Sequence, residues 1–216
     1  IIQNTNLAGI DINDISTGFA LSCMRIENAG TDGIHGINIT DLDLTDTTII
    51  YSGNAVGHNG IDIDGLFGTS NSIANSNILG SAEFNMRIEN TSASNSMAGV
   101  PDSLTVTGSR FTDTIASGVG ADCIFYGALG TANMSLFISE SVIEMCRTDA
   151  VQVDAANTSA MEFNITRSLI NQNNIGINIS SSQTSSMKFN IFDNVGPGMG
   201  LLNHTSNIIN VAHGVD

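Results

Sequence analysis

Phe163-Asn164-Ile165-Thr166-Arg167-Ser168-Leu169-Ile170 is the stretch that decides the fold. Apolar residues alternate with polar ones up to Ile165, a small polar interval follows, and a second apolar position comes after it. Alternation of this kind places every second side chain on one face of an extended strand. The stretch therefore predicts β-structure with one buried face. Related copies occupy residues 37–44, 72–79, 104–111, 136–143 and 189–195.

A shorter pattern of four residues falls between these copies, as in Gly60-Ile61-Asp62-Ile63. Related runs begin at residues 23, 85, 122, 150, 176 and 200, with spacings of 24 to 28 residues in four intervals and 37 in the other two. No segment carries a sustained apolar stripe of helical period. Strands that follow one another in the same sense without helices stack as successive coils, here of about 25 residues.

This repeat resembles that of the right-handed parallel β-helix superfamily, the fold of pectate lyases, polygalacturonases and many bacterial surface proteins. The resemblance covers nearly the whole chain. It implies an all-β, right-handed parallel β-helix solenoid of about seven to eight coils, in which residues 1–216 form a single segment of a longer chain. A leucine-rich repeat is the alternative, because residues 39–44 mimic one, but the other coils lack its leucine ladder and fixed Asn.

Stacking the four-residue runs predicts two inward columns of apolar side chains. Cys123 falls in the first column, so we expect it to be a small buried hydrophobic residue rather than half of a disulfide. The first column is Met24, Ile61, Met86, Cys123, Val151, Ile177 and Leu201, and the second is Ile26, Ile63, Ile88, Phe125 and Val153. A column of small polar residues is expected to turn inward and bond along the stack at Thr40, Asn75, Thr107, Ser139 and Thr166.

The charge balance restricts the partners. Six Lys and Arg stand against 21 Asp and Glu, for a net charge of −15 at pH 7. Nucleic acids and anionic membrane surfaces are bound by clustered Lys and Arg, so neither is an expected partner. No run of about 20 apolar residues occurs, so no membrane span is expected. An acidic surface suits a secreted protein, and the three cysteines then leave at least one thiol free.

The outward positions of the four-residue runs predict a cluster of charges on adjacent coils. Like charges one strand spacing apart repel each other unless a cation lies between them. Arg25 and Arg87 flank the acids and could neutralise them, which gives a surface ladder of ion pairs. The competing hypothesis is a calcium site, because Ca²⁺ prefers several clustered carboxylate oxygens. Its ligands would be Glu27, Asp62, Asp64 and Glu89.

The two long intervals exceed the others by about ten residues and predict inserted loops. We place these loops near residues 45–59, 91–102 and 112–121. Loops that emerge from a rigid solenoid often carry binding, or they contact a neighbouring chain.

No catalytic set is recognisable in the sequence. A polygalacturonase-like site needs paired carboxylates, and that family's adjacent Asp pair, Gly-His-Gly and Arg-Ile-Lys are missing. A lyase-like site needs Ca²⁺ and an Arg or Lys base, for which Arg25 and Arg87 are the only candidates. Both lie beside acids, which makes them poor bases. The four histidines have no partner at a recognisable spacing.

We therefore expect no catalysis and no cofactor other than calcium. The expected function is that of a structural or adhesive rod in a large extracellular bacterial surface protein or filament. Its expected partners are neighbouring domains of the same chain, a laterally packed copy or a surface glycan. The alternatives are a polysaccharide-active β-helix enzyme acting on acidic glycans, and a carbohydrate-binding module.

Overall fold

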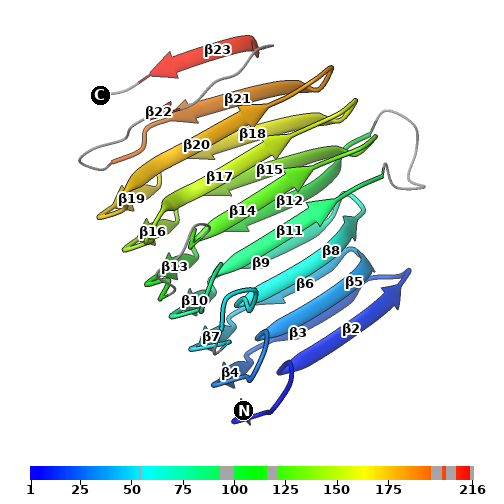
Figure 1. Cartoon of the computed structure of the whole chain (residues 1–216), viewed down its shortest axis with the longest axis vertical. Coiled ribbons are helices and arrows are strands. Elements are labelled where there is room, and N and C mark those ends of the chain that lie inside the picture. Colours follow the sequence, from blue (N-terminus) through cyan, green and yellow to red (C-terminus); the bar gives the residue numbers. More distant parts are fainter. Residues whose placement is uncertain (54, 93–99, 116–120, 196–200, 203–207, 215–216) are drawn as a thin grey trace.

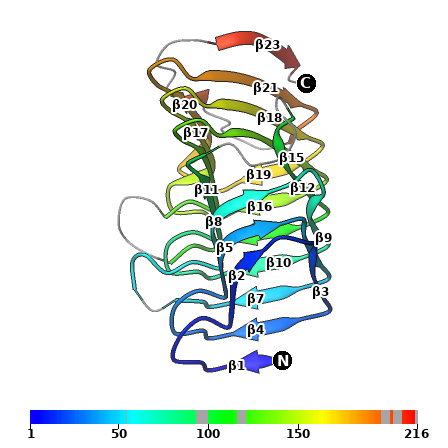
Figure 2. The same cartoon turned by 90° about the vertical axis from the view of Figure 1, so that its right-hand side faces the viewer.

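The computed structural model describes residues 1–53, 55–92, 100–115, 121–195, 201–202 and 208–214. These residues form strands and turns without a helix, and every pair of neighbouring strands is parallel. The chain winds right-handed into a solenoid of about seven coils stacked along one axis, with residue 1 at one end and β23 at the other (Figures 1 and 2). The predicted parallel β-helix is confirmed.

Each coil contributes one strand to each of three sheets, in the order A, B, C. Sheet A contains β1 (Ile2–Gln3), β4 (Arg25–Glu27), β7 (Thr48–Ile50), β10 (Asn77–Leu79), β13 (Arg110–Thr112), β16 (Val142–Glu144) and β19 (Leu169–Asn171). Sheet B contains β2 (Ile10–Ile15), β5 (Ile34–Thr40), β8 (Ile61–Phe67), β11 (Met86–Asn90), β14 (Ile124–Ala128), β17 (Asp149–Ala155), β20 (Ile175–Ser181) and β22 (Leu201–Leu202). Sheet C contains β3 (Phe19–Ser22), β6 (Leu42–Thr45), β9 (Asn71–Ala74), β12 (Asp102–Thr107), β15 (Asn133–Ser139), β18 (Ala160–Thr166), β21 (Ser186–Phe192) and β23 (Ile208–Gly214).

The interior is a set of apolar columns that run along the axis. In sheet B, Ile61 is paired with Met86, and Val151 with Ile177, and none of the four is more than 2% exposed. The second predicted column is also buried at Ile63, Ile88 and Val153. Each coil covers the apolar side chains of the next, so the core is continuous and its stability is shared between neighbouring coils.

The predicted register is wrong at the N-terminal end. The run at residues 23–26 contributes β4 to sheet A, where Ile26 lies between Ile2 and Ile49 rather than beside Ile61. The neighbour of Ile61 is Ile34 of β5. Strand β5 was not recognised because its alternation of inward and outward residues is interrupted at Asn38. This residue adopts a left-handed conformation, with φ of 54°, so the residues after it change face.

The register is also wrong at β14, by one residue. Ile124 pairs with Met86 and Tyr126 with Ile88, so these two side chains take the inward positions assigned to Cys123 and Phe125. Tyr126 is fully buried because its hydroxyl donates a hydrogen bond to the carbonyl of Ser135 at 3.2 Å. Phe125 points outward and packs on Phe84, with ring centroids 5.7 Å apart.

Cys123 forms a disulfide with Cys146, which corrects the prediction that it is an unpaired hydrophobic residue. The two residues are 23 positions apart, close to the length of one coil, and their Cα atoms lie 5.4 Å apart. In an earlier coil the same corner holds a glycine against a serine, since a Cβ added to Gly60 would lie 2.7 Å from Ser81 Oγ. The corner between sheets A and B therefore brings these positions within bonding distance.

The inward polar column lies further along the chain than expected. Thr107 and Ser139 are aligned and 3.3 Å apart through their hydroxyls, but both are only half-buried, and Thr40 belongs to sheet B. The buried ladder occupies the corner between sheets C and A, where each backbone N–H donates to the side-chain oxygen one coil further on, at 2.9 to 3.2 Å. Its members are Thr47, Ser76, Ser109, Ser141, Ser168 and Asn194.

The predicted loops are only partly described. Residues 45–59 include strand β7, whose Ile49 is completely buried, so residues 48–50 belong to the core of a coil, and residue 54 lies outside the described part of the chain. Within the predicted loops at 91–102 and 112–121, residues 93–99 and 116–120 lie outside the described part of the chain.

Candidate functional site

The outer face of sheet B gathers most of the charged side chains that sequence analysis singled out. Two outward rows run along it. One row holds the residue before, and the other the residue after, each member of the buried column that contains Ile63 and Ile88. The first row is Asp11, His35, Asp62, Arg87, Phe125, Gln152 and Asn178. The second row is Asn13, Ile37, Asp64, Glu89, Gly127, Asp154 and Ser180.

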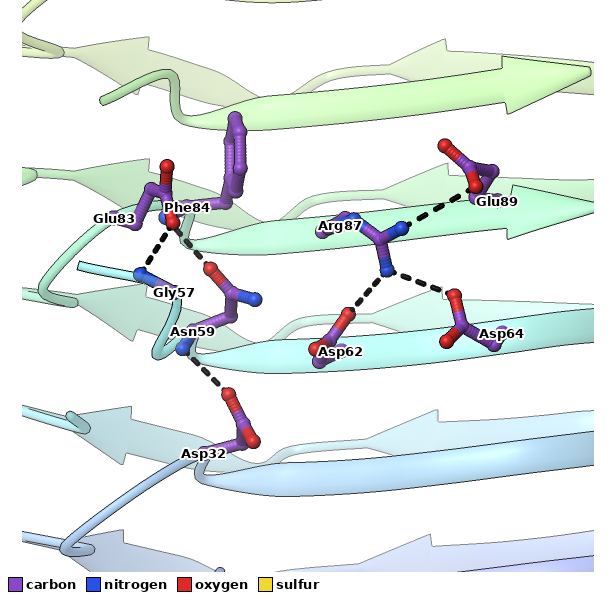
Figure 3. Close-up of polar contacts among 9 residues, drawn as sticks. All are labelled: Asp32, Gly57, Asn59, Asp62, Asp64, Glu83, Phe84, Arg87 and Glu89. Carbon is purple, nitrogen blue, oxygen red and sulfur yellow. Dashed lines mark hydrogen bonds and ion pairs between the residues drawn. The ribbon is translucent and has the colours of Figure 1, made fainter. Parts of the chain in front are cut away.

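Arg87 is the centre of a cluster formed by β8 and β11, and Figure 3 shows three carboxylates around its guanidinium. Its Nη1 lies 2.8 Å from both Asp62 Oδ1 and Asp64 Oδ1, and its Nη2 lies 3.4 Å from Glu89 Oε1. Strand pairing fixes this geometry, because Arg87 is aligned with Asp62, and Glu89 with Asp64. The Arg87 side chain is 24% exposed, whereas that of Asp64 is 59% exposed.

The charge states in this cluster follow from burial and pairing. Burial alone would lower the pKa of Arg87, but its hydrogen bonds to Asp62 and Asp64 outweigh burial and raise that pKa. Burial raises the pKa of Glu89, and the nearby Arg87 offsets only part of this effect. These contacts favour the protonated form of Arg87, whereas the base of a lyase reaction must lose its proton.

The four proposed calcium ligands do not come together. Glu27 lies on β4 in sheet A, where it pairs with Arg25, and this placement corrects the predicted set. Asp62, Asp64 and Glu89 do meet, but all three contact Arg87. Within the described ranges, no three His, Cys, Asp or Glu side chains gather closely enough to hold a metal ion. Calcium binding at Asp62, Asp64 and Glu89 would require Arg87 to move away from these carboxylates, and it stays a prediction.

A pocket of about 350 Å³ opens beside this cluster, where the ends of β5, β8 and β11 meet. Its lining includes the charged residues Asp64, Arg87 and Glu89 and the apolar residues Ile37 and Phe67. Sequence analysis did not find this pocket, because it depends on β5 being the neighbour of β8.

A line of polar contacts precedes sheet B at the corner between sheets A and B. The backbone N–H of Asn59 donates to Asp32 Oδ1 at 2.6 Å, and that of Phe84 donates to Asn59 Oδ1 at 3.0 Å (Figure 3). Glu83 accepts a hydrogen bond from the Gly57 N–H at 2.5 Å. Burial raises the pKa of Asp32, although the hydrogen bond from Asn59 opposes this effect. Asp32 and Asn59 thus tie each coil to the next.

Asp122 holds the same position two coils further on. Its Oδ1 accepts hydrogen bonds from the hydroxyl of Thr148 and from the N–H of Asp149, the latter at 2.8 Å. Its Oδ2 is buried and has no hydrogen-bond partner in the described part of the protein. Burial raises the pKa of Asp122 to about 6, and the hydrogen bond from Thr148 opposes this rise. Burial also raises the pKa of Asp149, which accepts a hydrogen bond from Asn178 at 2.7 Å.

His35 is the histidine of this face, and it lies between two acids of the first row. Its Nδ1 is 3.0 Å from Asp11 Oδ1, and Asp62 is its neighbour on the other side. The hydrogen bond with Asp11 raises the pKa of His35, while burial opposes the rise. Sequence analysis assigned no partner to His35 because the pairing of β2 with β5 was not recognised.

Comparison of the chain with protein-family models, with curated proteins and with solved structures gave no match. The resemblance to pectate lyases and bacterial surface proteins therefore stays an inference from the repeat in the sequence. No helix in the described residues is long and apolar enough to cross a membrane.

Proposed function

We propose that this solenoid is a structural or adhesive rod segment of a large extracellular bacterial surface protein or filament, and that it does not catalyse a reaction. The observation that carries the proposal is the regular stacking of all three sheets. Sheet A pairs without a break from β1 to β19, and sheets B and C pair from β2 to β20 and from β3 to β21. A solenoid with an unbroken core transmits force along its axis and holds its two ends at a fixed separation.

The disulfide supports an extracellular location. Disulfides form and persist in oxidising compartments and are rare where glutathione keeps thiols reduced. Cys123 and Cys146 are at most 3% exposed as whole residues, so the bond between them is a buried structural link. Cys23 remains as an exposed free thiol.

The chemistry of the sheet B face supports a non-catalytic role. Arg87 is held by three carboxylates, and the same contacts occupy Asp62, Asp64 and Glu89. A general acid and base pair needs two groups whose protonation states can change during turnover. The proposed partners are neighbouring domains of the same chain, a lateral copy of the rod or a surface glycan.

A polysaccharide-active enzyme or a carbohydrate-binding module is the second candidate. The pocket beside Arg87 favours it, because pockets of several hundred Å³ are typical of small-ligand sites. The net charge of −15 counts against an acidic glycan, since like charges repel.

Incubation with pectin, polygalacturonate and alginate, with and without Ca²⁺, tests the choice between these functions. The rod proposal predicts no release of reducing ends and no unsaturated product absorbing in the ultraviolet. Turnover that disappears in Arg87→Ala would establish the enzyme instead. Electron microscopy of the full-length secreted protein should show the segment as part of a straight rod, and a separate globular head at this position would contradict the proposal.

A further inference from the structure

We propose that the pocket between β5, β8 and β11 binds a primary ammonium group carried on a short apolar stem, such as a diamine or a lysine side chain. This inference goes beyond the structural role and does not depend on it. The pocket's volume of about 350 Å³ matches a ligand of this size. Its lining combines carboxylates, which would pair with the ammonium group, with apolar side chains, which would contact the methylene groups of the stem.

The charged side chains of the pocket favour a cationic ligand. Of the residues that line the pocket, Asp64 and Glu89 are acidic and Arg87 is basic, so the acidic side chains outnumber the basic one. Arg87 reaches Asp64 through Oδ1 and Glu89 through Oε1, so the second oxygen of each carboxylate is left as an acceptor. The pocket therefore attracts a cation and repels an anion.

The lining of the pocket includes three side chains that accept hydrogen bonds. A primary ammonium has three N–H donors. Two acceptors are the carboxylates of Asp64 and Glu89, which lie on adjacent strands. The third is Asn38 Oδ1, because the amide nitrogen of Asn38 donates to Asp14 Oδ1 at 2.9 Å and so fixes the amide's orientation.

Gly65 lies in the lining of the pocket beside Asn38 and Phe67. Gly65 has φ of +89°, and a Cβ at this position would lie 3.0 Å from Asn38 Oδ1 and 3.1 Å from the Phe67 ring. A side chain at this position would be strained and would press against both groups, so glycine allows Asn38 Oδ1 and the Phe67 ring to lie this close to the backbone.

The lining of the pocket also contains the apolar residues Ile37 and Phe67. Ile37 is 38% exposed although it lies in the middle of a β-strand, and it faces the same pocket as Phe67. A ligand with methylene groups would cover part of this surface. A bare inorganic cation would leave it exposed to water.

The experiment is an NMR titration of the ¹⁵N-labelled protein at low ionic strength. The probes are cadaverine, as the free amine, and Nα-acetyl-lysine methylamide, as the side chain of a partner. We expect saturable shifts at residues around Gly65 for at least one of them, and the probe that binds identifies the source. Tetramethylammonium, which has no N–H donor, and 1-pentanol, which has no charge, should bind at least about tenfold more weakly.

Two isosteric variants test the assignment. Asp64→Asn and Glu89→Gln should each weaken binding by about tenfold, because each removes a charged acceptor. Asp154→Asn is the matched control, since Asp154 lies in the same outward row two coils further on and outside the pocket, and it should change the affinity less than twofold. The absence of saturable shifts with both amines would overturn the proposal, as would equal affinity in wild type, Asp64→Asn and Glu89→Gln.

Discussion

The carboxylates around Arg87 lie on the outer face of sheet B, and Asp122 lies at the buried corner that precedes this sheet in a nearby coil, and they are held in opposite ways. Asp62 and Asp64 each form an ion pair with the guanidinium of Arg87 at 2.8 Å. Asp122 is buried more deeply and is bonded only to neutral donors, the hydroxyl of Thr148 and the N–H of Asp149. The neutral donors at Asp122 do not fully offset the hydration that its carboxylate loses on burial.

The repeat itself shows that the charge of Asp122 is not needed for its structural contact. Asn59 accepts the N–H of Phe84 with a neutral amide oxygen, at the position equivalent to Asp122. Asp32 does the same with a carboxylate. The corner contact requires an acceptor of this length, so an ionised acid there costs stability that an asparagine would not.

The largest expected effect comes from the disulfide beside Asp122. Replacing both Cys123 and Cys146 with Ala should lower the free energy of unfolding by about 3 kcal/mol, because the bond restricts the unfolded chain. Chemical denaturation, with and without reductant, measures this loss. Cys23→Ala is the control and should leave stability unchanged, because Cys23 is a free, exposed thiol. A loss below about 1 kcal/mol would show that the link restricts little.

The second prediction concerns the sign of the pH dependence at Asp122. Its folded pKa of about 6 lies above the ordinary 3.8, so the folded protein binds a proton more tightly than the unfolded chain. This group therefore favours folding most below about pH 4, and its contribution falls as the pH rises to about 6.

Asp122→Asn should remove this pH dependence and raise stability at pH 7.5 by about 2 kcal/mol, because the amide keeps the acceptor and loses the charge. Thermal melts at pH 4, 6 and 7.5 measure the effect. Asn59→Asp is the reciprocal control and should destabilise the protein more at pH 7.5 than at pH 4. A variant less stable than wild type at pH 7.5 would contradict the assigned cost of ionisation.

The third prediction sharpens the other half of the comparison. Arg87→Met should destabilise the protein by about 1–2 kcal/mol at pH 7, because three carboxylates lose their cation while the apolar stem is kept. Near pH 4 the loss should shrink, since protonation relieves the repulsion. Arg110→Met is the control, because Arg110 contacts the single carboxylate Glu144 on the outside of sheet A. Equal losses in both variants at both pH values would refute the cluster's special role.

The smallest effect is expected at His35. Its hydrogen bond with Asp11 raises the histidine pKa, so this pair favours folding at low pH and loses that contribution as the pH rises through the folded pKa. NMR titration should give His35 a pKa above 6.5, and Asp11→Asn should bring it down. An unchanged His35 pKa in that variant would show that Asp11 is not the cause.

The solenoid could be predicted because its signal is repeated many times. Alternating runs such as residues 61–63 and 151–153 each mark a strand, and a mistake in one coil leaves the others intact. The exact register could not be predicted, because single left-handed residues such as Asn38 shift the alternation without changing the composition. Gly36 hid β5 further, since a glycine takes the inward position between Ile12 and Ile63.

The candidate site followed the register, so only part of it was found. Arg87, Asp62, Asp64 and Glu89 were placed together correctly because β8 and β11 follow each other with a regular spacing. Glu27 was misplaced with β4. The disulfide was missed because a slip of one residue at β14 assigned Cys123 to the inward column of sheet B instead of the corner beside Cys146. A separation near the length of one coil was the signal that could have revealed it.

The central claim is that residues one coil apart lie side by side in register, and cysteine cross-linking on sheet C tests it most directly. In a Cys23→Ser background, Asn164→Cys with Asn190→Cys should form a disulfide under mild oxidation, because the two positions are paired on neighbouring strands β18 and β21. Asn164→Cys with Lys188→Cys, slipped by two residues, should not. Cross-linking of the slipped pair but not of the aligned pair would contradict the stacked coil.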